Sequence, residues 1–175
     1  MTSDIARHAI TPSESSLWLS DASVTGYFTM LRLIDSRMYD IQKDHVRSLF
    51  LTSIDAQILF ENINRRDWRT IEKCLTGFAA RSYLDQNNIF FAGKMFIPLN
   101  TPGHWTLAVI FFKEKSIVYY DSFNKTPKDG LLNPKRLLDM LEQYASENVY
   151  PVTFVRSQWR FTTADCVHQV HEIYF

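Results

Sequence analysis

The first half of the chain carries apolar residues at the three- and four-residue intervals of amphipathic helices. Residues 21–34 show this spacing, and Ser20 or Asp21 stands before them as a candidate N-cap. The spacing recurs between Asp44 and Ala80, at Phe50, Ile54, Ile58, Leu59, Ile63, Trp68, Ile71, Leu75 and Phe78. We therefore predict one helix over about 21–34 and a mainly helical stretch over 44–80.

The second half changes to segments rich in β-branched and aromatic residues, separated by short turn signals. Strands are predicted over 95–99, 104–112 and 116–121. The short polar segment Lys113-Glu114-Lys115 makes the last two an antiparallel hairpin. Because 104–112 is apolar at both alternating sets of positions, this strand is predicted to be buried at the centre of the sheet.

The C-terminal part adds further elements. Asn133-Pro134 is a typical helix start, and the apolar stripe that follows predicts a helix ending near Asn148. A strand is predicted over 150–156, and a closing helix begins at Asp165. The fold class expected from this order is α+β, with a helical N-terminal half packed on a central mixed or antiparallel sheet and a C-terminal helix.

Composition and charge narrow the choice of partners. The chain has 175 residues, 46% of them hydrophobic, and its 19 basic residues balance 19 acidic ones. A neutral chain has no bulk attraction to nucleic acid or to an anionic membrane. No apolar run approaches the roughly 20 residues that cross a bilayer, and the N-terminus lacks a signal-peptide pattern. We expect a soluble monomer of the cytoplasm or nucleus, with a flexible lead over 1–16 and one domain over 17–175.

Cysteine and histidine usage argues against disulfides and metal. The two cysteines, Cys74 and Cys166, are too few for a disulfide framework. His168 and His171 are the only closely spaced histidines, and no second pair accompanies them at zinc-site spacing. We therefore expect no metal or organic cofactor, and we expect Cys74 to be a buried, inert thiol of a helix.

Three residues suited to nucleophilic catalysis stand at the ends of predicted elements. His104 begins the central strand and Asp121 ends its hairpin partner, so antiparallel pairing brings the two together. The carboxylate would fix the imidazole tautomer and stabilise its charged form. Cys166 stands at a helix N-terminus, where the helix dipole favours the thiolate. From spacing alone, each residue also fits a structural role, as a buried histidine, a turn carboxylate or a core thiol.

These residues lie within blocks that follow one another along the chain. The blocks are Trp18-Leu19-Ser20-Asp21, Phe96-Ile97-Pro98-Leu99-Asn100, Gly103-His104-Trp105-Thr106-Leu107-Ala108-Val109, Ile117-Val118-Tyr119-Tyr120-Asp121-Ser122, Gln158 and Asp165-Cys166. Together they resemble the ubiquitin-like-protein-specific protease family, the SUMO-protease type of cysteine protease, whose clan includes the adenovirus protease. The resemblance runs from residue 17 to the end and implies a papain-like cysteine protease architecture.

The resemblance implies a role for each catalytic residue. Cys166 is the nucleophile, His104 is its base and later the acid for the leaving amine, and Asp121 orients His104. Gln158 joins the Cys166 backbone N–H in the oxyanion hole. Because Gln158 stands eight positions before Cys166, slightly more than is usual in the family, Arg160 or the Thr162 hydroxyl are alternatives for this place.

The resemblance also implies a substrate channel. Trp18 and Trp105 match two aromatics that roof a narrow tunnel, which only a Gly-Gly tail without side chains can enter. As an alternative, both indoles are core aromatics. Asp21 matches an acidic residue that faces the basic tail of the modifier, and its alternative role is a helix cap.

The expected function is a thiol protease or isopeptidase that cleaves after the C-terminal Gly-Gly of SUMO, ubiquitin or a relative, from precursors or conjugates. The partners are then the modifier and its conjugates, and the location is a host cytosol if the chain is a pathogen effector. One alternative is an effector-type protein acetyltransferase of the same clan. The other is a catalytically silent modifier-binding module, suggested by Val167 where the family has glycine and by the short segment after Cys166.

Overall fold

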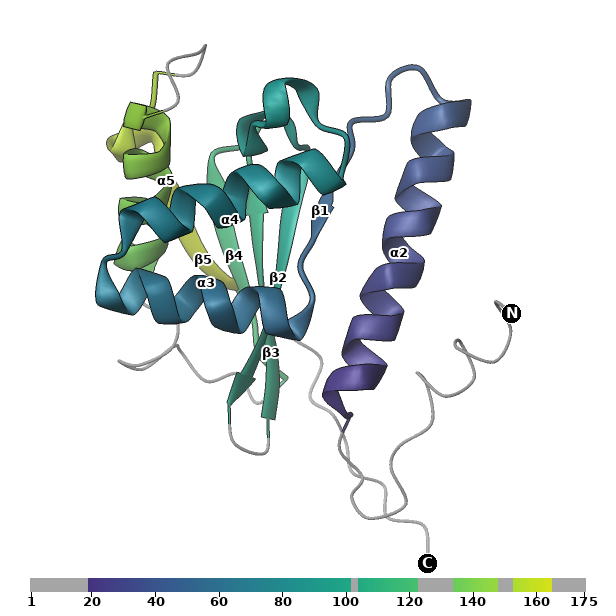
Figure 1. The fold of residues 1–175 in the computed structure, drawn as a ribbon, viewed down its shortest axis with the longest axis horizontal. Coiled ribbons are helices and arrows are strands. Elements are labelled where there is room, and N and C mark those ends of the chain that lie inside the picture. Colours follow the sequence, from purple (N-terminus) through teal and green to yellow (C-terminus); the bar gives the residue numbers. More distant parts are fainter. Residues whose placement is uncertain (1–18, 102–103, 123–133, 148–152, 165–175) are drawn as a thin grey trace, which may run out of the picture.

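The computed structural model describes residues 19–101, 104–122, 134–147 and 153–164 (Figure 1). The helices are α2 (Asp21–Ile41), α3 (Ser53–Arg65), α4 (Trp68–Arg81) and α5 (Pro134–Glu147), with short 3-10 turns η1 (Asp85–Asn87), η2 (Ile89–Phe91) and η3 (Arg156–Gln158). The strands are β1 (Leu49–Phe50), β2 (Lys94–Thr101), β3 (His104–Phe111), β4 (Ser116–Tyr120) and β5 (Arg160–Ala164). The predicted α+β fold class is confirmed. The lead over 1–16, Trp18 and the closing helix from Asp165 lie outside the described residues.

The strands form one sheet in the order β1-β2-β3-β4-β5. β2, β3 and β4 are antiparallel neighbours, and β1 and β5 add to the two sides in parallel orientation. The hairpin of β3 and β4 and the central place of β3 agree with the sequence prediction. This mixed topology puts the first residue of β3 and the last residue of β4 at the same end of the sheet.

One face of the sheet packs against α3, α4 and α5, and we call it the helical face (Figure 1). Its central side chains are fully buried: Met95, Ile97, Ala108, Ile110 and Ile117 are each 0% exposed. The opposite face, which we call the α2 face, is covered by α2 only near β1 and β2. There Phe28 meets Phe50 edge-on at 6.2 Å, and Phe50 stacks on Phe96 at 4.7 Å between ring centroids. The hydrophobic core therefore lies mainly on the helical face.

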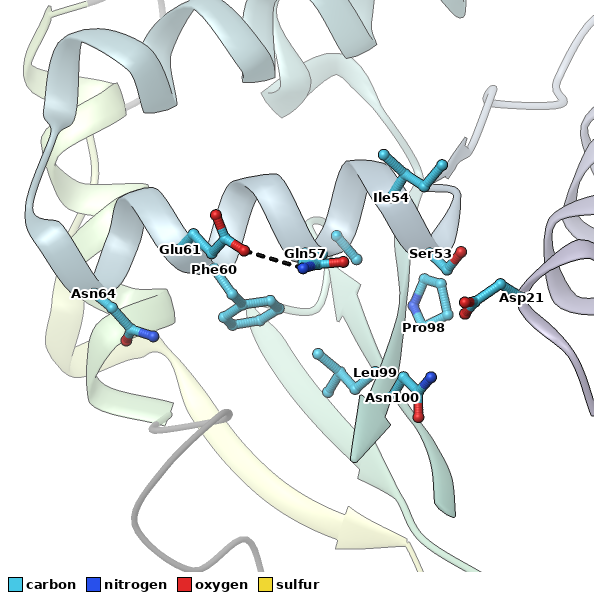
Figure 2. A pocket seen from close by; sticks show the side chains of 11 residues that line it. Asp21, Ser53, Ile54, Gln57, Phe60, Glu61, Asn64, Pro98, Leu99 and Asn100 are labelled. Atoms are coloured by element: carbon cyan, nitrogen blue, oxygen red, sulfur yellow. Dashed lines mark hydrogen bonds between the residues drawn. The ribbon is translucent and has the colours of Figure 1, made fainter. Parts of the chain in front are cut away.

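Side-chain caps fix where the N-terminal helices begin. Ser20 caps α2, since its hydroxyl accepts the backbone N–H of Ser23 at 3.1 Å. Thr52 and Asp55 form a reciprocal capping box at the start of α3. Figure 2 shows that α3 starts beside the first turn of α2 and runs past the end of β2.

The structure corrects three of the predicted elements. α2 ends at Ile41 and not near 34, because Leu31, Ile34, Met38 and Ile41 keep the helical spacing of apolar positions. The two-residue strand β1 was not predicted within the helical stretch. The strand predicted over 150–156 is wrong for the described residues 153–156, which contain no strand. Phe154 stacks on Trp159 at 5.5 Å instead, and the strand is β5, which begins ten residues after the predicted start.

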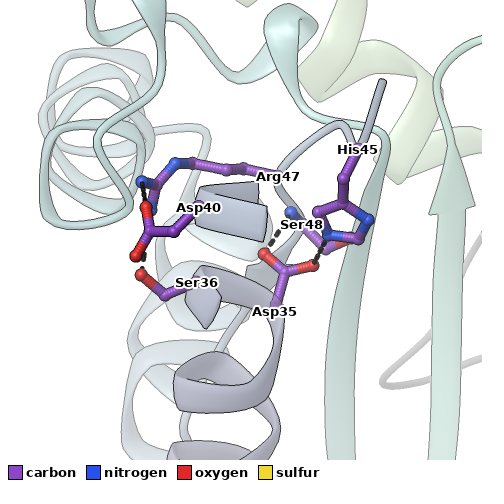
Figure 3. A network of polar contacts seen from close by, with 6 residues as sticks. All are labelled: Asp35, Ser36, Asp40, His45, Arg47 and Ser48. Carbon is purple, nitrogen blue, oxygen red and sulfur yellow. Dashed lines mark hydrogen bonds and ion pairs between the residues drawn. The ribbon is translucent and has the colours of Figure 1, made fainter. Parts of the chain in front are cut away.

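A buried carboxylate ties the C-terminal half of α2 to the segment before β1 (Figure 3). Asp35 accepts one hydrogen bond from His45 Nε2 at 2.8 Å and another from the backbone N–H of Ser48 at 2.9 Å. Its side chain is 10% exposed, so both bonds are largely shielded from water. Nearby, the Arg47 guanidinium lies 4.0 Å above the Tyr39 ring. α2 is thus held to the sheet by polar contacts as well as by Phe28.

Replacement of Asp35 by alanine is expected to lower the free energy of unfolding by about 1–3 kcal/mol, because the Ser48 N–H loses its acceptor. Urea denaturation followed by circular dichroism measures the change. The matched control is Asp40→Ala, whose 70% exposed carboxylate lies 3.9 Å from Arg47 and should contribute within about 0.5 kcal/mol of zero. Equal effects of the two substitutions would contradict this account.

Candidate active site

His104 and Asp121 meet at the end of the central hairpin. Leu107 pairs with Tyr120, so the residue that follows Tyr120 lies beside the first residues of β3. His104 Nε2 lies 2.6 Å from Asp121 Oδ1. Because a carboxylate oxygen only accepts, Nε2 carries the proton of this bond, and Nδ1 is left on the other side of the ring for proton exchange. The pairing expected from the hairpin is present.

The His104–Asp121 pair is largely buried. The Asp121 side chain is 4% exposed and the His104 side chain is 15% exposed. A buried carboxylate is costly unless it is hydrogen-bonded, and the imidazole supplies such a bond. Burial chiefly, together with the negative charge of Asp121, raises the pKa of the neighbouring Tyr119 phenol. Tyr119 therefore stays protonated at neutral pH, and the imidazole is the better candidate for a base here.

Trp105 lies on the opposite side of β3 from His104, because neighbouring residues of a strand alternate between faces. Its indole Nε1 donates to the carbonyl oxygen of Leu19 at 2.7 Å, across 86 positions of sequence. Beneath this contact is a pocket of about 490 Å³, lined on one side by Val24 and Tyr27 of α2 and on the other by Leu107 of β3. The bond therefore joins the residues before α2 to the start of β3. No pattern in the sequence predicted it.

Asp21 lies at the rim of a second pocket, of about 410 Å³, between the first turn of α2, α3 and the end of β2. Figure 2 shows its carboxylate beside Ser53 and Pro98. Ser20, and not Asp21, is the N-cap, so the capping role considered for Asp21 is not the one it has. The carboxylate is stabilised by the helix dipole in the first turn and is exposed for contact with a partner.

Gln158 does not lie with the His104–Asp121 pair. It stands just before β5, and Ser116 at the start of β4 pairs with Arg160 at the start of β5. Its side-chain oxygen accepts a hydrogen bond from Lys115 Nζ, in the turn between β3 and β4. Asp121 follows the other end of β4, five residues or about 17 Å from Ser116 along the strand. The position of Gln158 therefore does not support the predicted oxyanion role.

The two alternatives for the oxyanion site are also placed by β5. Arg160 pairs with Ser116, at the other end of β4 from Asp121. Thr162 pairs with Val118, in the middle of β4. Among the described residues of β5, Ala164, which pairs with Tyr120, lies at the end of the sheet where Asp121 lies. Cys166 and Trp18 lie outside the described residues.

Cys74 lies on α4 and is half-buried. Burial chiefly, with a smaller contribution from Asp55, raises the pKa of its thiol, so less of it is thiolate at neutral pH. In a Cys166→Ala variant we expect Cys74 to be alkylated by iodoacetamide at least about tenfold more slowly in the folded protein than in guanidinium chloride. Mass spectrometry of timed samples measures both rates. Equal rates would show that Cys74 is a reactive thiol.

Within the described residues, no three or more histidine, cysteine, aspartate or glutamate side chains lie together in a way suited to a metal ion. No helix of this part of the chain is long and apolar enough to span a membrane.

Solved structures with a similar fold are SUMO proteases at low sequence identity. A de-sumoylating protease matches with a TM-score of 0.60 and 17% identity, over 95% of this chain and 60% of its own. The SUMO protease Ulp1, with its catalytic cysteine oxidised to a sulfonic acid, matches with a TM-score of 0.56 and 20% identity, over 88% of this chain and 59% of its own. The C-terminal Ulp1 protease domain in complex with Smt3, the yeast ortholog of SUMO, matches with a TM-score of 0.55 and 16% identity. The match covers 97% of this chain and 75% of that domain's chain. The chain thus spans about 60% of the length of the first two structures.

Family membership rests on the sequence. No curated protein matches the chain. The family model of the Ulp1 protease family, C-terminal catalytic domain, matches residues 17–169, which is most of the 175 residues. The chain therefore belongs to the Ulp1 protease family, as a C-terminal catalytic domain.

Proposed function

We propose that this chain is a thiol protease that cleaves after the C-terminal Gly-Gly of a ubiquitin-like modifier, in precursors or conjugates. The observation that carries the proposal is the bond of 2.6 Å between His104 and Asp121 at the end of β3 and β4. The chain leaves β5 at Ala164, which pairs with Tyr120 next to Asp121. Cys166 follows two positions later, and two extended residues span at most about 7 Å. The proposal places the Cys166 thiol beside this pair.

The proposed reaction proceeds through a thioester. His104 Nδ1 takes the proton of the Cys166 thiol, and the thiolate attacks the carbonyl carbon of the terminal glycine. The bond to the leaving amine breaks as the imidazolium returns the proton to the nitrogen. Water then attacks the thioester and gives a proton to His104, which passes it to the departing sulfur. Asp121 holds the ring in place and stabilises its charge at each step.

The proposed channel for the Gly-Gly tail follows from the contact between Trp105 and Leu19. That hydrogen bond fixes the indole at the start of β3, and Trp18 directly precedes Leu19 in the sequence. Two indoles on either side of an extended chain leave room for glycine and exclude larger side chains. Asp21, exposed two positions after Leu19, is available to a basic residue of the modifier.

The test is a reaction of the purified chain with SUMO, ubiquitin and other modifiers that carry an electrophilic C-terminus. We expect one modifier to form a covalent adduct, which Cys166→Ala abolishes and Cys74→Ala leaves unchanged. SUMO is the first choice, because a structural neighbour is a Ulp1 domain in complex with Smt3. A folded chain that binds a modifier without an adduct would instead be a silent binding module. A chain that neither binds nor reacts would leave the acetyltransferase alternative.

A further inference from the structure

A third pocket lies at the other end of the sheet from His104. Its volume is about 530 Å³, and it is bounded by the segment before β1, the start of β2, the turn between β3 and β4, and the segment around η3. β3 is eight residues long, which separates this pocket from His104 by about 23 Å. A ligand in this pocket would therefore leave the candidate active site open.

Four aromatic rings form the wall of this pocket. Phe112 meets Phe90 edge-on at 5.7 Å and Trp159 edge-on at 6.4 Å. Phe154 stacks on Trp159 at 5.5 Å, so the rings hold one another in place. Phe112 is 8% exposed and anchors the cluster to the core, whereas the other three rings are only partly buried. The wall thus presents a fixed apolar surface that fits one bulky apolar side chain.

The rim of the pocket is positively charged. Lys113 and Lys115 come from the turn between β3 and β4, and Glu114 is the carboxylate of the same turn. Among the described residues neither of these two lysines forms an ion pair, and Lys115 bonds the neutral amide of Gln158. Lys94 of β2 also lines the pocket, but its ammonium lies 5.3 Å above the Phe111 ring, on the α2 face. Two cations against one anion leave the rim with a net positive charge in a chain whose formal net charge is zero.

We propose that this pocket, which we call the aromatic–lysine pocket, is a docking site for an acidic peptide segment of a partner protein that inserts one aromatic or large aliphatic side chain. The apolar wall receives the inserted side chain, and the lysine rim pairs with carboxylates before and after it in the peptide. The proposal does not depend on the protease activity, since it uses none of the proposed catalytic residues.

The shape of the pocket favours a peptide over a nucleic acid. Non-specific binding of nucleic acid relies on a basic stripe that tracks several successive phosphates. Here the lysines surround one concave site, and Glu114 interrupts them in the turn. Arg156, the arginine of η3, forms ion pairs with Asp139 at 2.6 Å and with Glu142 at 3.0 Å. The positive charge of the rim therefore suits an acidic peptide whose carboxylates lie next to one apolar anchor residue.

The test uses fluorescence anisotropy with the full chain and a short labelled peptide, in which one phenylalanine is flanked by aspartate and glutamate. We expect saturable binding that weakens with added salt. A peptide with serine in place of the phenylalanine should bind about tenfold more weakly. The double variant Lys113→Glu/Lys115→Glu, on exposed or partly exposed positions of the turn, should weaken binding by about tenfold or more.

The matched control is Lys73→Glu, on the exposed surface of α4, which should change affinity less than about twofold. Lys113→Glu alone is a second variant that must also weaken binding. Circular dichroism verifies that each variant is folded. Absence of binding, equal effects of Lys73→Glu and the turn variant, or displacement of the peptide by single-stranded oligothymidylate at lower concentration would each overturn the proposal, the last in favour of a nucleic acid.

Discussion

Replacement of Asp121 by asparagine is expected to lower kcat for cleavage of a modifier with a fluorogenic C-terminal amide by about 10²–10⁴-fold, with the fold intact. Asparagine has nearly the shape of aspartate, so the buried site, where the Asp121 side chain is 4% exposed, stays filled. The chemistry changes, because the amide nitrogen would donate to His104 Nε2. The ring proton then moves to Nδ1, the nitrogen that is proposed to accept the thiol proton, and the charge that stabilises the imidazolium is lost.

The control is Asp139→Asn on α5, which alters the ion pair between Asp139 and Arg156 of η3 and should leave kcat unchanged. Both variants should show the thermal midpoint of the parent within a few degrees, which separates loss of chemistry from loss of folding. A kcat for Asp121→Asn within about threefold of the parent would remove Asp121 from the mechanism. Because the expected loss is in the chemical step, KM should change far less than kcat.

The hairpin that carries this pair is the part of the fold best predicted from sequence. Its strands are rich in β-branched and aromatic residues, and a short polar segment between them predicts the hairpin. Local signals of this kind need no knowledge of the rest of the chain. The N-cap of α2 is also a local signal: the sequence offers Ser20 and Asp21 as candidates, and Ser20 is the cap.

The errors come from elements whose partners are distant in sequence. β1 is two residues long and exists because it pairs in parallel with Met95 and Phe96. The register of β5 against β4 places Gln158 beside Lys115, at the wrong end of the sheet for an oxyanion donor. Spacing in the chain gives the number of residues before Cys166, but the direction in which a strand carries them is set by pairing. The oxyanion role of Gln158 therefore stays a prediction from its place in the sequence.

The largest loss of stability is expected for Ile110→Ala, on the helical face of β3. Ile110 pairs with Met95 on one side and with Ile117 on the other, and all three side chains are 0% exposed. Removal of the larger side chain leaves a cavity that the neighbouring strands and the helices above them close only in part. We expect the free energy of unfolding to fall by about 2–5 kcal/mol, out of a typical total of about 5–15 kcal/mol.

Val118→Ala is the matched control, because Val118 lies on β4 with its side chain on the α2 face, opposite Val109, and is only partly buried. Its loss should cost about 1 kcal/mol. Urea titration followed by circular dichroism measures both variants, and a constant m-value verifies that only stability has changed. Equal losses would mean that the α2 face contributes as much to the core as the helical face. A much smaller loss for Val118→Ala would instead show that the helical face provides most of the stability. The α2 face, with the pocket between Tyr27 and Leu107, could then change its contacts without unfolding the domain.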